Sequence, residues 1–304
     1  MYYNIVEVIN VAGWDEILRE IQTTPGSFDV VRRKYLDKLA KITNRNVIAY
    51  YSGFLTKPTA PNTDINDSDM SGFMNALKGI DTTKGLDLLL HTPGGNPTAA
   101  ESIVKYLRTK FNNDIRIIVP HMAMSAGTMI ACCGKVIIMG KHSSLGPIDP
   151  QFNGIPAYDI LQMYTDAKNE LSSGQNTVLY WKLLLDRYPA PFVYTAISAI
   201  KLSSVLVKEW LGTCMFDANT DQAVIDRIAN ALNEHNDSKA HSRHFDMAYC
   251  KSLGLKIVDL ESDQKLQDAI LSLHHAYIFT IESTNTVKII ENQRGKALVS
   301  MTKA

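Results

Sequence analysis

This 304-residue sequence has no excess of charge of either sign, because lysine and arginine together number 31 and aspartate and glutamate also number 31. A protein with balanced charge has no net field that would attract nucleic acid or an anionic membrane. We therefore expect neither of these as its main partner.

Long apolar segments and an N-terminal sorting signal are also missing. Residues 1–4, Met-Tyr-Tyr-Asn, lack the basic start of a secretory leader, and neither its apolar stretch nor its cleavage site follows. Apolar runs such as 88–90 and 136–139 have the length of buried strands, far below the roughly 18 residues that a spanning helix needs. We expect a cytoplasmic protein without a membrane span.

Cysteine is scarce, and recognisable cofactor motifs are absent. The 4 cysteines show no Cys-x-x-Cys spacing and are typical of reduced thiols rather than of a disulfide framework. The sequence has no Gly-x-Gly-x-x-Gly segment for a dinucleotide and no lysine in a context that singles out pyridoxal phosphate. We predict that the protein uses no cofactor and no metal ion.

The middle third alternates short apolar runs with amphipathic stretches. Residues 86–91 and 115–119 are predicted strands, and 136–139 is another. Between the first two, Asn96 is placed to cap a helix whose first residue is Pro97. This alternation predicts an α/β fold with a mostly parallel sheet.

The flanking regions are predicted to be largely helical. Residues 1–45 form a helical N-terminal extension, and residues 46–304 form one domain without a clear internal linker. The predicted helices of the second half lie near 158–172, 177–187, 191–211 and 219–234. Later strands are predicted at 256–260, 276–281 and 287–292, the last two paired, with His274 and His275 at the end of a helix.

Two small-residue motifs each follow a predicted strand. Gly94 and Gly95 expose backbone amides at a strand-to-helix turn, and Ser125 precedes Ala126 and Gly127 at the start of a helix. Acyl transfer needs an oxygen nucleophile together with donors aimed at the oxyanion of the tetrahedral intermediate. If the two strands are neighbours, the amides of Gly95 and Ala126 can form that oxyanion hole.

Three segments resemble the serine dehydrogenase proteinase family. They are His91-Thr92-Pro93-Gly94-Gly95, Ala123-Met124-Ser125-Ala126-Gly127-Thr128 and Ser144-Leu145-Gly146-Pro147-Ile148-Asp149-Pro150-Gln151. The family is related to signal peptide peptidase A and more distantly to the proteolytic subunit of Clp protease, and the resemblance covers roughly residues 45–295.

The resemblance implies a Clp/crotonase-type spiral of ββα units. It also implies Ser125 as the nucleophile, and an oxyanion hole at Gly94, Gly95 and Ala126. A peptide or protein is the implied substrate, and a homo-oligomer built from trimers or related rings is the implied assembly.

The sequence offers more than one base that could accept the proton of Ser125. Clp-type enzymes use a histidine and an aspartate, and this sequence departs from that pattern. Asp149 stands in the segment that would carry the histidine, and the segment that would carry the aspartate falls near His241.

Relatives of signal peptide peptidase A use a lysine instead, and Lys168 follows Ser125 by 43 residues. A lysine base must be neutral, so its pKa has to fall from about 10.4 toward the working pH. The neighbouring Asp166 and Glu170 would act in the opposite direction if they lie close to it. We predict a Ser125–Lys168 dyad.

Several alternatives remain open at this point. His241 is the rival base, with Asp149 or another carboxylate to orient it, since an unperturbed histidine already titrates near pH 6.5. Other options are a base at Lys182 or Lys208, or an inactive chain. A zinc site drawn from His235, His241, His244 and Cys250 lacks a ligand set of firm spacing. His91 and His121 are expected to pack at strand ends.

The sequence thus predicts a serine peptidase that works through an acyl-enzyme on Ser125. An inactive oligomeric scaffold of the same fold is one alternative. An acyl-CoA enzyme of the crotonase type is another, although a serine at this helix start argues against it.

Overall fold

The computed structural model describes residues 13–152, 154–174, 177–186, 190–217, 219, 221–233 and 242–302. Its centre is a seven-stranded sheet in the order β10-β5-β3-β2-β1-β11-β12. The strands span Asn46–Ser52 (β1), Leu86–His91 (β2), Ile115–Val119 (β3), Val136–Met139 (β5), Ile257–Asp259 (β10), Thr286–Asn292 (β11) and Ala297–Met301 (β12). From β10 to β1 neighbouring strands run parallel, whereas β11 is antiparallel to both β1 and β12. The predicted α/β fold with a mostly parallel sheet is confirmed.

Short strands extend the edge of this sheet at which the site lies. Met122–Ala123 (β4), Ser144–Leu145 (β6) and Phe245–Asp246 (β9) form a three-stranded sheet, and Gln151–Phe152 (β7) pairs with Ile155–Pro156 (β8).

Helices cover both faces of the large sheet. Their bounds are Trp14–Thr23 (α1), Ser27–Thr43 (α2), Asp69–Leu77 (α3), Pro97–Phe111 (α4), Ala126–Ala131 (α5), Ala157–Ser172 (α6), Val178–Leu185 (α7), Ala190–Trp210 (α8), Gln222–Asn233 (α9), Met247–Leu253 (α11) and Gln264–Ser283 (α12). Shorter helical turns are Thr82–Lys84 (η1), Leu211–Met215 (η2) and Leu260–Ser262 (η3). The predicted cap is correct, because the Asn96 side chain accepts a hydrogen bond from the Thr98 amide in front of α4.

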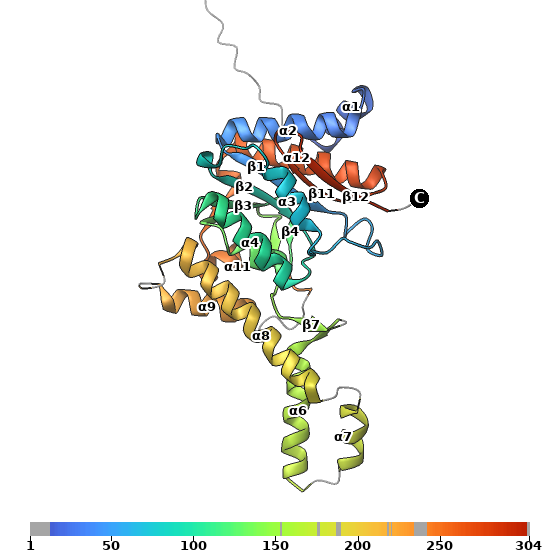
Figure 1. The fold of residues 1–304 in the computed structure, drawn as a ribbon, viewed down its shortest axis with the longest axis vertical. Coiled ribbons are helices and arrows are strands. Elements are labelled where there is room, and N and C mark those ends of the chain that lie inside the picture. Colours follow the sequence, from blue (N-terminus) through green and yellow to red (C-terminus); the bar gives the residue numbers. More distant parts are fainter. Residues whose placement is uncertain are drawn as a thin grey trace, which may run out of the picture.

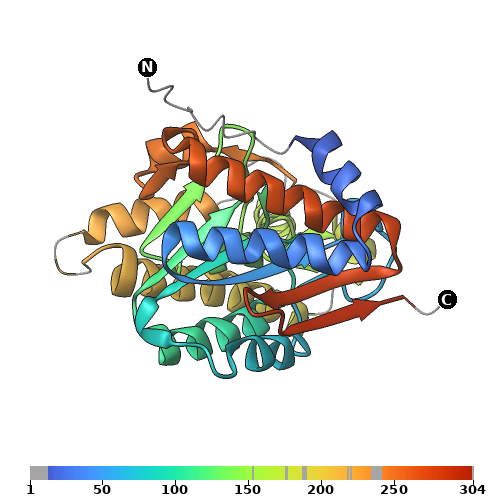
Figure 2. The ribbon, with the colours of Figure 1, turned by 90° about the horizontal axis from the view of Figure 1, so that it is seen from above.

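The alternation of side chains along each strand divides the core into two layers. On β1, Val47, Ala49 and Tyr51 face the layer formed with α1, α2 and α12. Ile48 and Tyr50 face the opposite layer, which contains α3, α4, α5 and part of α8. Helices α2 and α12 lie side by side across the sheet (Figure 2). The helices predicted for the N-terminal extension therefore pack on the same core as the sheet.

One secondary-structure prediction is wrong. Residues 276–281 belong to α12 and are not a strand, so His274 and His275 lie within a helix rather than at its end. Ala269, Leu273 and Ala276 recur at helical spacing on the buried side of α12, and this packing overrides the β-type composition of 276–281. The strand predicted at 287–292 is present as β11, but it pairs with β1 and β12.

A helical arm projects from the body (Figure 1) and is formed by α6, α7 and the first part of α8. Its surface carries large apolar side chains that are exposed in the single chain: Leu171, Val178, Leu179, Tyr180, Leu183 and Tyr194. A contiguous group of exposed apolar side chains of this kind is uncommon on the surface of a folded chain.

Within the described residues, the helical segment Pro191–Met215 is long and apolar enough to cross a bilayer by length and composition alone. One such helix is weak evidence for a membrane span, and no apolar run of this kind was expected from the sequence.

Candidate active site

Two loops meet at one edge of the sheet because β2 and β3 are parallel neighbours, which was the condition for a shared oxyanion hole. The loop after β2 carries Gly94 and Gly95, and the segment after β3 carries Ser125. Thr92 ties them together: its amide donates to the Met122 carbonyl at 3.1 Å, and its carbonyl accepts from the Met124 amide at 3.0 Å. The predicted nucleophile and the predicted oxyanion loop therefore lie next to each other.

Ser125 has an unusual backbone conformation, with φ 50° and ψ −118°. It is one of four non-glycine residues with positive φ among those described. A serine in such a conformation is strained by roughly 1–3 kcal/mol, and such strain gathers at functional sites. Ser125 stands immediately before α5 and remains partly exposed, so its hydroxyl is open to a substrate.

Gly94 packs directly beneath the nucleophile. Its φ is +98°, and a Cβ at this position would lie 2.6 Å from both the Ser125 Cβ and the Met124 carbonyl oxygen. The Gly94 amide donates to the Thr92 hydroxyl at 3.2 Å. The structure therefore gives Gly94 a packing role, because its amide already has a partner.

Gly95 directs its amide away from the segment around Ile65 that lies beside it in the same chain. Ile65 donates to the Gly94 carbonyl at 2.7 Å and accepts from the Asn96 amide at 2.8 Å. In a parallel bridge of this kind, the residue between the two bonded positions directs its own N–H to the other side. For Gly95 that side is the pocket, which Gly95 lines together with Ser125 and Ala126.

Helix α5 is fixed in place by close packing and by one buried hydroxyl. A Cβ on Gly127 would lie 2.5 Å from a methyl carbon of Thr92, so only glycine allows this approach. The Thr128 hydroxyl lies 2.8 Å from the carbonyls of Ala123 and Gly146 and accepts from the Gly146 amide at 2.9 Å. These contacts hold the segment 144–148 against the helix that begins after the nucleophile.

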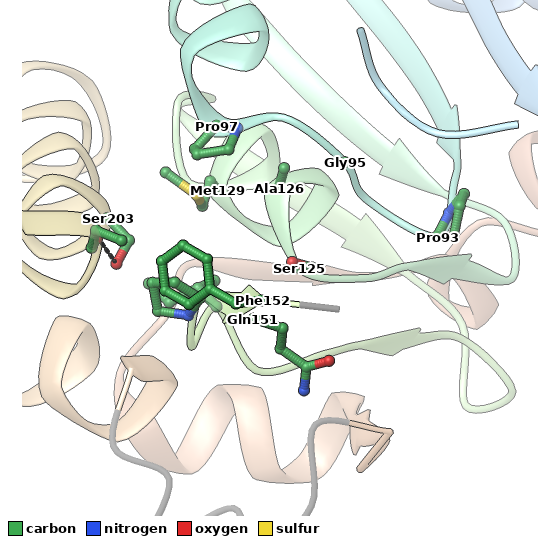
Figure 3. Close-up of a pocket in the computed structure, with 12 residues that line it drawn as sticks. Pro93, Gly95, Pro97, Ser125, Ala126, Met129, Gln151, Phe152 and Ser203 are labelled. Carbon is green, nitrogen blue, oxygen red and sulfur yellow. Dashed lines mark hydrogen bonds between the residues drawn. The ribbon is translucent and has the colours of Figure 1, made fainter. Parts of the chain in front are cut away.

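The pocket over Ser125 has a volume of about 310 Å³ and a largely apolar lining (Figure 3). Its walls are Pro93, Gly95, Pro97, Ser125, Ala126, Met129, Ile148, Pro150, Gln151, Phe152, Ala199 and Ser203. Ser125 lies between the Gly95 loop and the Gln151–Phe152 strand. This lining contains no lysine, arginine or histidine, so within the described part of the chain the base is not supplied from the pocket wall.

The structure does not bring Lys168 to Ser125 within one chain. Helix α6 begins at the pocket, where the Ala157 amide donates to the Pro150 carbonyl at 2.9 Å. Lys168 follows Ala157 by eleven residues, about 16 Å along a helix with a rise of about 1.5 Å per residue. Its side chain is exposed on the arm.

The carboxylates that were expected to act on Lys168 have other partners. The Trp181 indole N–H donates to Glu170 at 2.7 Å, and Gln162 donates to Asp166 at 2.7 Å. The role of Lys168 as base stays a prediction.

The rival base lies outside the described residues, which exclude 234–241 and hence both His235 and His241. Asp149 is fully buried and has an interaction partner, and its neighbours Ile148 and Pro150 line the pocket. Whether Asp149 orients a base stays a prediction.

The remaining candidates have structural surroundings of their own. Lys208 pairs with Asp226 at 2.7 Å, and Lys182 is exposed on α7. The His244 ring lies 3.2 Å from the Ser144 hydroxyl, and the thiol of Cys250 is buried. In the described ranges no three side chains among His, Cys, Asp and Glu are arranged to hold a metal ion.

The sequence interpretation missed a cluster of histidines on the other face of the sheet. His91 and His121 do not line the pocket; their rings pack against each other and against His274 of α12. The expectation that His91 and His121 pack at strand ends is confirmed. Their third partner was missed because the end of α12 had been predicted as a strand.

Comparison with known proteins gives a family for this architecture. A family model described as ClpP-like SDH-type serine proteinase matches residues 27–180, just over half of the chain. Two uncharacterized proteins of Methanocaldococcus jannaschii are similar. MJ0137 is 34% identical over 155 residues, which are 49% of this chain and 53% of that protein. MJ1495 is 36% identical over 115 residues, 38% of this chain and 39% of that protein. The matched part of the chain thus spans about half of the first relative's length and less of the second's.

A solved structure is also similar in part. It is a serine-to-alanine mutant of 1510-N, a membrane-bound stomatin-specific protease, 19% identical over 65% of this chain and 92% of that one. The TM-score of 0.28 is too low for the two structures to be compared in detail.

Proposed function

Because this chain belongs to the ClpP-like, SDH-type serine proteinases, we propose that it hydrolyses peptide bonds through an acyl-enzyme on Ser125. The observation that carries the proposal is the meeting of three groups at one pocket: the Ser125 hydroxyl and the amides of Gly95 and Ala126. Each amide makes no other hydrogen bond within the described part of the chain.

In this mechanism Ser125 attacks the carbonyl carbon of the scissile bond. The two amides stabilise the negative charge that develops on the carbonyl oxygen, and the apolar wall beside them takes up a side chain of the substrate. A base removes the serine proton and then returns it to the leaving amine. Water hydrolyses the acyl-enzyme in a second step.

We assign the base to Lys168, acting within a homo-oligomer. In the single chain Lys168 lies along the arm, beyond the reach of its own side chain to Ser125. The exposed apolar side chains of the arm support an assembly in which the arm packs against another copy. Burial of any lysine disfavours its charged form, so such packing would favour a base at this position.

The nucleophile is tested by replacing Ser125 with alanine and measuring hydrolysis of unstructured peptides with apolar residues. We expect activity to fall at least about a thousandfold, because the acyl-enzyme cannot form. Ser203→Ala is the matched control, since Ser203 lines the same pocket and its hydroxyl bonds to Ala199 and Ile200 carbonyls of its own helix. Equal activity of the Ser125 variant and wild type would exclude the assignment.

An inactive scaffold of the same fold is the second candidate, and the absence of a basic side chain from the described pocket wall favours it. A wild-type protein that cleaves no peptide and resists a serine-directed fluorophosphonate would support the scaffold. Stabilisation by an acyl-CoA in a thermal-shift screen would point instead to crotonase-type chemistry.

A further inference from the structure

Three imidazoles form a compact triangle beneath the two loops of the site. His91 ends β2, His121 lies in the turn between β3 and β4, and His274 is in the middle of α12. Their ring centroids are 5.5 Å apart for His91–His121, 5.5 Å for His91–His274 and 5.8 Å for His121–His274. We call these three residues the histidine triangle.

The triangle is mostly sealed from water by aromatic rings. The His91 side chain is 1% exposed, and neither of its ring nitrogens has a hydrogen bond of normal geometry. Phe54 and Tyr51 pack on it with centroids at 5.0 and 5.4 Å. The Tyr51 hydroxyl lies 3.1 Å from Nδ1 of His274. His121 and His274 are both partly exposed, but burial lowers the pKa of His274 further than that of His121, so His121 takes up a proton first.

Charge on any member of the triangle would lack compensation. Burial lowers the pKa of His91 to about 3, and it lowers the pKa values of His121 and His274, with neighbouring histidines adding to the effect. The Met122 carbonyl acts in the opposite direction on His91 without forming a regular hydrogen bond. The titratable groups facing the triangle from the surrounding elements are Tyr51, His142, His244 and His275, with Glu261 4.0 Å from His142.

The backbone joins the triangle to both catalytic loops. His91 directly precedes Thr92, whose hydroxyl accepts from the Gly94 amide and whose backbone pairs with Met122 and Met124. His121 directly precedes Met122, and its carbonyl accepts from the Ser144 amide at 2.7 Å. His91 and His121 are therefore each attached beside a strand end from which a site loop begins.

We propose, on the basis of the peptidase function above, that the histidine triangle is a positioning element that holds the Gly95 loop and Ser125 in register only while all three imidazoles are uncharged. A proton on His121 places an uncompensated charge among buried neutral rings, and hydration of that charge draws this ring toward water. The segment that leads to Ser125 then separates from the Thr92 bridge, and the oxyanion hole opens.

The coupling can be measured without any catalytic activity. In a Ser125→Ala protein labelled with ¹⁵N-glycine, the amide resonances of Gly94 and Gly95 are followed from pH 8 to pH 5, alongside the His121 ring. We expect both glycines to shift with the midpoint of His121, below its ordinary value of 6.5. In His121→Gln they should stay constant, and in His275→Gln they should titrate as before. His275 is the matched control because it is a neighbouring histidine that contacts Trp14 and His274 but is not one of the three rings.

Glycine resonances that stay constant while His121 titrates in the folded protein would overturn the proposal, and this outcome does not depend on whether His121→Gln folds. Equal titration in His121→Gln would overturn it as well.

The same variants give an independent activity readout, the rate of labelling by a fluorophosphonate. Below the His121 midpoint the labelling rate of wild type, divided by that of His121→Gln, should fall about tenfold for each pH unit. Glycine shifts that follow His121 in a protein never labelled at Ser125 would support the triangle and refute the peptidase. Labelling at Ser125, combined with Gly94 and Gly95 resonances that do not follow the His121 titration, would support the peptidase and refute the triangle.

Discussion

The body and the arm of this protein differ in how their functional residues are held. In the body, the loops after β2 and β3 are fixed by glycines that no side chain could replace without a clash, and by a buried threonine hydroxyl. In the arm, α6 and α7 present large apolar side chains to solvent and carry the predicted base at an exposed position. The proposed nucleophile and its oxyanion donors thus meet within one chain, whereas the proposed base would depend on what the arm contacts.

The largest effect is expected from adding one methyl group in the body. Gly94→Ala places a Cβ against Ser125 and Met124 at a φ of +98°, so the nucleophile and the oxyanion hole must shift. We expect labelling by a fluorophosphonate to slow by about 10²–10³-fold, the loss typical of a damaged oxyanion hole.

Gly154→Ala is the control for the Gly94 variant. Gly154 has a φ of +81°, but nothing lies within 4 Å of its added Cβ. Wild-type labelling of Gly94→Ala would contradict the packing role given to this glycine.

The next effect tests the predicted base on the arm. Lys168→Met should slow peptide hydrolysis by about 10²-fold or more, because general-base catalysis typically contributes 10²–10⁴-fold. The midpoint of chemical unfolding of the monomer should not change, since the side chain is exposed in the single chain. Lys182→Met changes the other exposed arm lysine that was an alternative base, and it should keep its activity if Lys168 is the base. Full activity of Lys168→Met would show that Lys168 is not the base and would favour His241 or another lysine.

A smaller effect distinguishes the buried histidines of the body from the arm. His91 has a pKa of about 3 in the folded protein against an ordinary value of 6.5, so between these values the unfolded chain binds more protons. Stability should therefore be fully present above about pH 6.5 and fall as the pH drops toward 3, by up to about 1.4 kcal/mol per pH unit for this residue.

Urea unfolding of wild type and His91→Phe at pH 7 and pH 5 checks this slope. Wild type should lose more stability than His91→Phe between pH 7 and pH 5, since phenylalanine does not titrate. An unchanged difference would show that His91 has an ordinary pKa.

The smallest effect on stability is expected on the arm, where Leu179 is 71% exposed in the single chain. Leu179→Glu should change the free energy of unfolding of a monomer by no more than about 0.5 kcal/mol, as is usual for surface substitutions. It should nevertheless reduce the molar mass measured by light scattering, because a charge on an apolar interface opposes association. A monomeric wild type at micromolar concentration would refute the role of the arm.

The sequence was sufficient for the parts of this architecture that depend on local signals. Short segments of the sequence encode the strands at 86–91 and 115–119, the Asn96 cap and the small residues around Ser125. The loops after the two strands lie close together because these strands pair in parallel. The histidine triangle joins residues up to 183 positions apart in the chain, and no periodicity reports such a contact. It also depends on α12, where packing against α2 overrides the β-type composition of 276–281.

The base was beyond sequence reasoning for a different reason. Lys168 follows Ser125 by 43 residues and lies on the predicted helix, as expected. The sequence did not reveal that this helix runs along the arm and carries Lys168 away from the pocket. The strained conformation of Ser125 could not be predicted from the sequence either. Serine does not favour a φ of 50°, so the surrounding packing must impose this conformation.

The central claim, that Ser125 is the nucleophile of this pocket, is tested most directly by mapping the adduct of a fluorophosphonate probe by mass spectrometry. We predict one modified residue, Ser125, in the wild-type protein, and no adduct in Ser125→Ala. An adduct at Ser203 or elsewhere, or equal labelling of Ser125→Ala, would contradict the assignment.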